Sequence, residues 1–309
     1  MDILLNILII IATIFGLWGG AVWVVDSATH IAKKFGISEL VIGLTVVAIA
    51  TSLPEFAVTV SAAIKGQAAI SVGNVVGSNI FNLGIILGIV AIFGKVKISK
   101  ILLYRDGSLL MVTGLLLLLF FRNHNLSRIE GILLALTLLI YIITLIKQKN
   151  NIELDEEIPE GNFKSVDILK LIFGVAVIIL SANYLVEAAS DIARAFGISE
   201  WTIGITIVAA GTSMPEFATS IVALIKGRND ISIGNLIGSD LFNLLGVLGT
   251  ASIIRPLSLT SNEYIGLILL AVSYVFLLIM MRTGWKISRF EGIILILLAL
   301  LRWSWEFIF

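Results

Sequence analysis

The sequence contains no cysteine, and it is poor in charged residues and in proline. The absence of cysteine excludes disulfides, zinc–thiolate sites and thiol catalysis. Charged residues make up only 14% of the 309 positions, whereas soluble domains carry about 25%. The formal net charge is zero, so nothing attracts the chain as a whole to nucleic acid. The remaining sequence is 58% hydrophobic with a mean hydropathy of +1.06, and a water-soluble fold of this length could not bury so much apolar surface.

Long apolar runs fill most of the chain. A helix needs about 20 mostly apolar residues to cross a bilayer, and ten stretches meet this requirement. We therefore predict an all-α, multi-pass membrane protein with ten transmembrane helices and the lipid bilayer as its surroundings. The ten stretches are 4–28, 39–64, 69–94, 101–121, 127–147, 167–192, 200–225, 230–254, 261–281 and 289–308.

The two halves of the chain are copies of one another. A shift of 161 residues aligns them without a gap, and about half of the positions between 39 and 94 are then identical. Five spans per copy is an odd number, so the second copy must enter the membrane from the opposite side. Secondary transporters with such inverted repeats bind their substrate near the midplane, where the copies meet. The expected domains are a first five-helix repeat at 1–147, an acidic linker at 148–166 and a second, inverted repeat at 167–309.

Lysine and arginine are unevenly distributed over the predicted loops. Fifteen of the 21 fall on the side that holds the central linker, and six fall on the other side. Cytoplasmic loops carry the excess of positive charge. The linker is therefore expected in the cytoplasm, and both termini are expected outside.

Two carboxylates stand in the middle of apolar spans, at Glu55 and Glu216. A charged side chain at this depth costs at least about 2.5 kcal/mol and is normally functional. A structural alternative is an ion pair with a cation from another helix, but no Lys or Arg lies in the middle of any predicted span. The carboxylates therefore call for a bound cation or a proton.

A proline precedes each of these carboxylates, in Thr51-Ser-Leu-Pro-Glu55 and Thr212-Ser-Met-Pro-Glu216. Proline inside a helix lacks an N–H group and clashes with the preceding turn, so it breaks the helix. Broken backbone at membrane depth is tolerated where it lines a cavity. Carbonyls, hydroxyls and carboxylates then form an all-oxygen set, which suits hard cations such as Ca²⁺ and Na⁺. The candidate ligands in these segments are Glu55, Glu216, Thr51, Ser52, Thr212 and Ser213, with carbonyls near Ala48 and Ala209.

A polar stripe follows in the next span of each copy. Its residues are spaced i, i+4 and i+8, so they share one helix face. We expect Ser78, Asn82, Ser239 and Asn243 to contact ions. For Asn74 and Asn235, hydrogen bonding between helices is an equal alternative.

Asp240 breaks the symmetry of the repeat, because its counterpart is Asn79. It follows Ser239 directly and so points about 100° away from the stripe. It could line an access path or be capped by neighbouring hydroxyls, and we place it outside the immediate ion shell.

The polar segments resemble the α-repeats of the Ca²⁺/cation antiporter superfamily, the family of Na⁺/Ca²⁺ exchangers, in its prokaryotic form. The motifs are Gly43-Leu-Thr-Val-Val-Ala-Ile-Ala-Thr-Ser-Leu-Pro-Glu55 and Gly73-Asn-Val-Val-Gly-Ser-Asn-Ile-Phe-Asn82, with second copies at 204–216 and 234–243. The similarity covers essentially the whole chain. It implies a Ca²⁺ site flanked by Na⁺ sites in a prokaryotic cell membrane. Glu55 and Glu216 would ligate Ca²⁺ and be shared with Na⁺. The six Thr and Ser hydroxyls and the two alanine carbonyls would complete the sites, and Asn82 and Asn243 would be ligands or polar lining.

The resemblance also implies a function: an alternating-access antiporter that exchanges three Na⁺ for one Ca²⁺. Two carboxylates give the core a charge of −2, so one Ca²⁺ makes it neutral and three Na⁺ make it +1. The cycle is then electrogenic. Asn82 and Asn243 argue against K⁺ cotransport, because K⁺-dependent relatives carry Asp at such positions.

No enzymatic activity and no cofactor besides the transported Ca²⁺ and Na⁺ are expected, and the chain should function as a monomer. The first and sixth spans are expected to carry the gating motion. A Ca²⁺/H⁺ antiporter and a passive cation channel remain alternative functions. A membrane scaffold without transport would not explain why the costly polar residues are concentrated in four helices.

Overall fold

Apolar helices make up most of the structure, a computed structural model that describes residues 3–94, 96–148, 163–198 and 203–308. Within this part of the chain, seven helices are long and apolar enough to cross a membrane, and two bent helix pairs raise the number to nine if each pair is one span. The chain is therefore a multi-pass membrane protein. Residues 149–162, which form most of the predicted linker, lie outside the described residues, as do 199–202 at the start of the seventh stretch.

The helices of the first half follow the first five predicted stretches. They are α1 (Ile3–Phe35), α2 (Glu39–Ile42), η1 (Gly43–Val47), α3 (Ala48–Thr51), α4 (Leu53–Ile64), α5 (Ala68–Ile80), η2 (Phe81–Ile86), α6 (Leu87–Phe93), η3 (Leu102–Gly107), α7 (Ser108–Phe120), η4 (Phe121–Asn123) and α8 (Arg128–Lys147).

The second half repeats this order. Its helices are α9 (Val166–Ala195), η5 (Gly204–Val208), α11 (Ala209–Thr212), α12 (Met214–Ile225), α13 (Asn229–Leu241), η6 (Phe242–Val247), α14 (Leu248–Ile254), α15 (Ser261–Arg282) and α16 (Arg289–Ile308). From η1 to α6, every boundary recurs 161 residues later, from η5 to α14. The repeat seen in the sequence is thus also a repeat of local structure.

Both proline-containing spans are broken where the motifs predict it. The chain bends by 50° between 39–51 and Leu53–Ile64, and by 55° between 206–212 and Met214–Ile225. The prolines lie in the first turn of α4 and α12, where a missing N–H leaves no helical bond unmade. Each carboxylate therefore begins a new helix at the break.

Four two-residue strands, which the all-α prediction did not include, join the halves. β1 (Val96–Lys97) pairs with β4 (Lys286–Ile287), and β2 (Asn125–Leu126) pairs with β3 (Leu257–Ser258), both antiparallel. The 161-residue shift turns β1 into β3 and β2 into β4. Each ladder thus joins one half to the other in an equivalent way.

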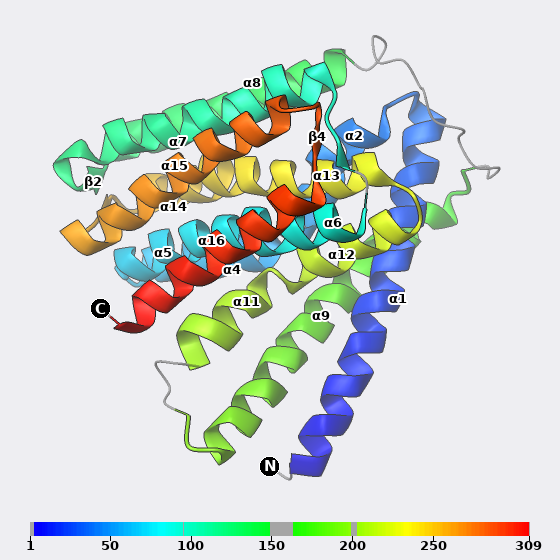
Figure 1. Cartoon of the computed structure of the whole chain (residues 1–309), viewed down its shortest axis with the longest axis horizontal. Helices are drawn as coiled ribbons and strands as arrows, with labels where there is room; N and C mark the ends of the chain where they lie inside the picture. Colours follow the sequence, from blue (N-terminus) through cyan, green and yellow to red (C-terminus); the bar gives the residue numbers. More distant parts are fainter. Residues whose placement is uncertain (1–2, 95, 149–162, 199–202, 309) are drawn as a thin grey trace.

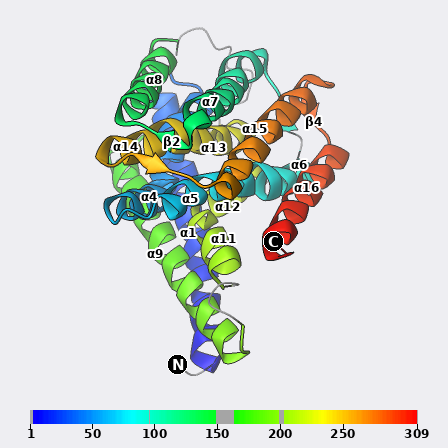
Figure 2. The ribbon, with the colours of Figure 1, turned by 90° about the vertical axis from the view of Figure 1, so that its left-hand side faces the viewer.

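Helices α1 and α9 lie side by side and project beyond the other helices in both views (Figures 1 and 2). Their contact is close because a Cβ on Gly20 would lie 2.8 Å from the carbonyl oxygen of Gly174. The spans built from α5 with its continuation and from α13 with its continuation are the most buried. The central position of these two spans places the polar stripes inside the protein.

Candidate ion-binding site

The two motif carboxylates are fully buried, and each is held by the other half of the chain. The Ser52 hydroxyl donates to Glu216 Oε1 at 2.8 Å, and the Ser213 hydroxyl donates to Glu55 Oε1 at 3.2 Å. Among the described residues, no ion pair involves either glutamate. Arg105, which lies toward the end of its span, pairs with Asp106 at 2.7 Å. The pair of carboxylates therefore has no protein cation beside it.

Several oxygens in this core accept no hydrogen bond from any residue that the structure describes. They are the second carboxylate oxygens of Glu55 and Glu216 and the amide oxygens of Asn82 and Asn243. Buried polar atoms are normally paired, so oxygens without partners need an explanation such as a ligand. No three His, Cys, Asp or Glu side chains in the described part of the chain cluster as a metal site. A cation held here would need hydroxyl, amide or carbonyl ligands as well, and these are the ligands that hard cations take.

The core has two sides that the repeat makes equivalent. The side between the first broken span and α13 is the more closely hydrogen-bonded of the two. The Thr51 hydroxyl lies 3.1 Å from Asn235 Oδ1 and 3.4 Å from the Ser239 hydroxyl. Ser239 in turn lies 3.3 Å from Glu216 Oε1 and 3.4 Å from the Ala48 carbonyl oxygen. The structure therefore brings these predicted ligands together.

The equivalent residues of the other side are less closely joined. The Thr212 hydroxyl donates to the Ala209 carbonyl at 3.3 Å, within its own segment, and Ser78 donates to the Val75 carbonyl at 3.2 Å. Ser78 also accepts a bond from Asn243 Nδ2 at 3.3 Å. No hydrogen bond joins Ser78 to Glu55 in the part of the chain that the structure describes. The two halves of the site thus differ although their residues match.

The carbonyl of Ala48 is not freed by the proline. It accepts the Ser52 N–H at 3.1 Å and lies 3.2 Å from the Thr51 hydroxyl. Pro54 lies six residues later, so its missing N–H concerns the next turn of the chain. The Ala48 carbonyl, a candidate ligand from the sequence, is therefore already hydrogen-bonded within its own segment.

The surroundings of four glycines show the same difference in packing between the two sides of the core. A Cβ on Gly238 would lie 2.6 Å from the Leu44 carbonyl oxygen, and one on Gly234 would lie 2.8 Å from the Leu40 carbonyl oxygen. In the part of the chain that the structure describes, their counterparts Gly77 and Gly73 have no atom within 4 Å of such a Cβ. The core is therefore closed between α13 and the α2–η1 segment, and it is open along the equivalent face of α5.

This asymmetry predicts unequal effects of alanine on thermal stability. Gly238→Ala forces η1 away from α13, and we expect a destabilisation of about 1–3 kcal/mol, the usual cost of overpacking. Gly77→Ala enters open space and should be neutral or stabilising by up to about 1 kcal/mol, because glycine weakens a helix. Thermal unfolding of both variants in detergent measures the difference. Equal losses in the two variants would contradict the packing described here.

Asn74 and Asn235 adopt the hydrogen-bonding role that was one of their two alternatives. Asn74 Nδ2 donates to Thr59 Oγ1 at 3.0 Å, and Asn235 Nδ2 donates to Ser220 Oγ at 3.0 Å. Each amide also lies near the backbone carbonyl of the glutamate in its own half, at 3.3 and 3.4 Å. Thr59 and Ser220 were not predicted from the sequence. Their position one turn after each glutamate was the available signal.

Asp240 lies deeper in the core than the sequence indicated. It is fully buried, Asn82 Nδ2 donates to its Oδ1 at 3.0 Å, and its Oδ2 accepts no hydrogen bond. The side chain is thus capped by an amide of the other half and not by hydroxyls. The Asn79 amide bonds both the Asp240 carbonyl, at 3.2 Å, and the Tyr274 hydroxyl, at 2.9 Å. The sequence analysis assigned no role to Asn79 or Tyr274.

Comparison with known proteins finds similarity over nearly the whole chain. The family model described as "Sodium/calcium exchanger protein" matches residues 5–147 and 167–302. The chain is 34% identical to the sodium/calcium exchanger MaX1 of Methanosarcina acetivorans, with 96% of each chain covered. It is also 34% identical to the putative antiporter CaxA of Alkalimonas amylolytica, over 93% of this chain and 96% of that one. Among solved structures, the sodium-calcium exchanger NCX_Mj soaked with zero Na⁺ and Ca²⁺ is similar, with a TM-score of 0.85 and 29% identity over 97% of this chain and 98% of that one.

Proposed function

Because this chain belongs to the sodium/calcium exchanger family, we propose that it is a secondary-active antiporter that exchanges Na⁺ for Ca²⁺. The membership confirms the resemblance seen in the motifs. One observation carries the proposal further: Glu55 and Glu216 are fully buried, each is held by a serine of the other half, and neither pairs with a cation among the described residues. Two buried carboxylates without a cation need positive charge from outside the protein.

The ions would share one set of oxygens. Glu55 and Glu216 would ligate Ca²⁺ through their unpaired oxygens and also serve Na⁺. The hydroxyls and carbonyls of both broken spans would complete the sites. Sharing enforces exchange, because Ca²⁺ and Na⁺ cannot occupy the same carboxylates together. The empty core would carry uncompensated charge, and its burial cost of several kcal/mol per ion would prevent it from crossing between states. No cofactor is needed for this cycle.

The architecture would be that of inverted repeats. We propose ten transmembrane helices in two five-helix units, in a chain that acts as a monomer. The equivalent β1–β4 and β2–β3 ladders support such a relation between the halves. With the central linker in the cytoplasm, the closed contact between α13 and α2–η1 faces the cytoplasm, and the open face of α5 faces outward. The structure would then be an outward-open state of an alternating-access cycle.

Calcium uptake into proteoliposomes tests the function. Vesicles loaded with Na⁺ and diluted into Na⁺-free medium should accumulate Ca²⁺, and collapse of the Na⁺ gradient should stop the uptake. Uptake that ignores the Na⁺ gradient would overturn the proposal.

A Ca²⁺/H⁺ antiporter is the second candidate, because the same unpaired carboxylate oxygens could carry protons. It predicts Ca²⁺ uptake driven by a pH gradient in the absence of Na⁺. A passive channel predicts flux without a counter-ion. The close packing of Gly234 and Gly238 on one side of the core argues against a continuous pore in this state.

A further inference from the structure

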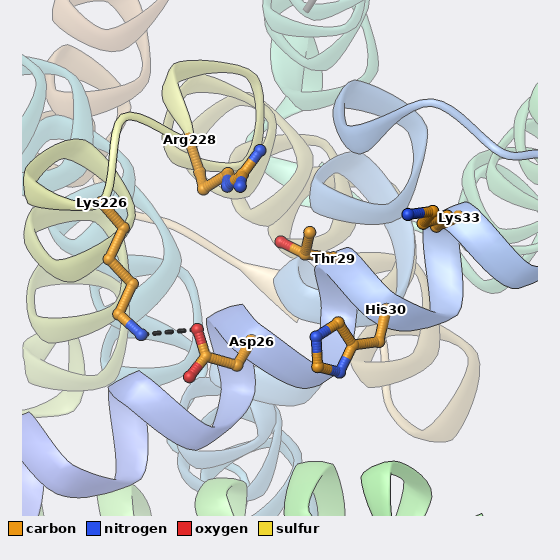
Figure 3. Close-up of a pocket in the computed structure, with 6 residues that line it drawn as sticks. All are labelled: Asp26, Thr29, His30, Lys33, Lys226 and Arg228. Atoms are coloured by element: carbon orange, nitrogen blue, oxygen red, sulfur yellow. Dashed lines mark hydrogen bonds and ion pairs between the residues drawn. The ribbon is translucent and has the colours of Figure 1, made fainter. Parts of the chain in front are cut away.

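An ion pair links α1 to the hairpin of α12 and α13 at the closed end of the core. Lys226 follows α12, and its Nζ pairs with Asp26 Oδ1 (Figure 3). This first charge pair, Asp26 and Lys226, borders a cavity of about 270 Å³ that is also lined by Thr29, His30, Lys33 and Arg228. It joins the α1–α9 unit to the hairpin of α12 and α13.

The repeat contains a second charge pair at the equivalent positions. The 161-residue shift converts Asp26 into Glu187 of α9, and Lys226 into Lys65 at the end of α4. Both charges are thus present with the same signs. In the described part of the chain, however, Glu187 and Lys65 form no ion pair, and both side chains are exposed.

The packing around the two pairs differs in the same direction. α1 packs along α12, whereas α9 has no comparable packing on α4 among the described residues. Val47 and Ile231, next to the α1–α9 unit, are 0% exposed, while their counterparts Val208 and Ile70 are 42% and 52% exposed. The α1–α9 unit therefore covers one end of a symmetric core and leaves the equivalent surface at the other end bare.

We propose that the two charge pairs form alternately, the first in the state seen here and the second in the oppositely open state. The proposal rests on the exchange cycle proposed above and assigns it four positioning residues: Asp26, Lys226, Glu187 and Lys65. When the α1–α9 unit moves to the bare end, α9 packs on α4 and Glu187 reaches Lys65. The first pair then separates. Each pair lowers the free energy of one state, so together they keep the two states close in population.

A further ion pair exists on one side only. Arg228 Nη1 pairs with Glu39 Oε1 at 3.1 Å at the closed end, and both side chains are largely buried. The position equivalent to Arg228 is Gln67, which carries no charge. The Arg228–Glu39 pair therefore favours the state seen here over the oppositely open state. Gln67 cannot form an equivalent ion pair at the other end of the core.

Engineered cysteines test the proposal directly, because the chain has none of its own. The variants are Asp26→Cys with Lys226→Cys and Lys65→Cys with Glu187→Cys, each treated with a short bifunctional methanethiosulfonate reagent in membranes. We expect both pairs to cross-link and each cross-link to stop exchange until it is reduced. The mismatched control, Asp26→Cys with Lys65→Cys, should not cross-link. Failure of the Lys65/Glu187 pair to link while the Asp26/Lys226 pair links would overturn the proposal, and so would equal linking of the control.

A charge swap provides an independent measurement. Exposed ion pairs contribute up to about 1 kcal/mol, so Lys65→Glu should slow Ca²⁺ exchange by up to about fivefold. Adding Glu187→Lys should restore the rate, although the two residues do not touch in this structure. Independent effects of the two substitutions would overturn the proposal. Cross-linking needs no ion gradient, so it can succeed or fail separately from the proposed Na⁺/Ca²⁺ exchange.

Discussion

Replacing Glu216 by glutamine will reduce Na⁺-driven Ca²⁺ uptake by at least about 100-fold. The substitution keeps the size of the side chain but removes one of the two glutamate charges, so a bound Ca²⁺ loses one compensating negative charge in a buried site. Removing one partner of a buried charge pair costs about 3–5 kcal/mol, and about 1.4 kcal/mol corresponds to a factor of ten. Glu55→Gln should have the same effect, because Ser52 and Ser213 hold the two carboxylates in equivalent ways.

A stability measurement separates loss of binding from loss of fold. Ligands that bind only the folded state raise its stability, so Ca²⁺ should raise the unfolding temperature of the wild-type protein. Glu216→Gln should lose this Ca²⁺-dependent rise while remaining at least as stable as wild type without ions, because repulsion between the two carboxylates is relieved. Glu157→Gln, the same chemical change in the polar segment between the repeats, serves as the control. Unimpaired exchange by Glu216→Gln would contradict the assignment of the site.

Each exchange cycle will move one net charge across the membrane. Three Na⁺ per Ca²⁺, the ratio that the family resemblance implies, carry one more positive charge than the Ca²⁺ they replace, and one elementary charge is worth about 2.3 kcal/mol per 100 mV. A potential of 100 mV should therefore change the equilibrium Ca²⁺ accumulation ratio by about 50-fold at a fixed Na⁺ gradient. The direction of the effect is also predicted. A potential that is negative on the side to which Na⁺ moves should favour Na⁺ movement to that side and Ca²⁺ movement away from it.

Vesicles with the potential clamped by a K⁺ gradient and an ionophore make this measurement possible. The same vesicles clamped at zero potential are the matched control. An accumulation ratio that does not change with the potential would mean that two Na⁺ exchange for one Ca²⁺, and the proposed stoichiometry would then be wrong.

Local features of the fold were predictable from the sequence. Pro54 and Pro215 lack an N–H group, so the breaks in the two spans follow from chemistry within a few residues. Glu55 and Glu216 could be identified as candidate site residues because burying a carboxylate in an apolar span costs free energy, whichever way its side chain points. The 161-residue repeat likewise indicated which elements would recur, and the helix boundaries follow it from η1 to α14.

Relations between the two copies could not be predicted in the same way. A repeat shows that Ser52 and Ser213 are equivalent, but it does not show that each bonds the glutamate of the other copy. Nor can two matching copies show which end of the core is closed, since Gly77 and Gly238 occupy equivalent positions of the repeat yet differ in packing. Asp240 was placed by helix geometry alone. Its hydrogen bond to Asn82 depends on tertiary packing, that is, on how α13 crosses η2.

Calcium uptake under separate ion gradients tests the central claim most directly. Proteoliposomes containing the wild-type protein or Glu216→Gln would receive ⁴⁵Ca²⁺ under an outward Na⁺, K⁺ or H⁺ gradient, each applied alone. The account predicts rapid uptake by the wild-type protein under the Na⁺ gradient, none under the K⁺ or H⁺ gradient, and none by Glu216→Gln under any of them. Uptake driven by the H⁺ gradient without Na⁺, or equal uptake with no gradient at all, would contradict it.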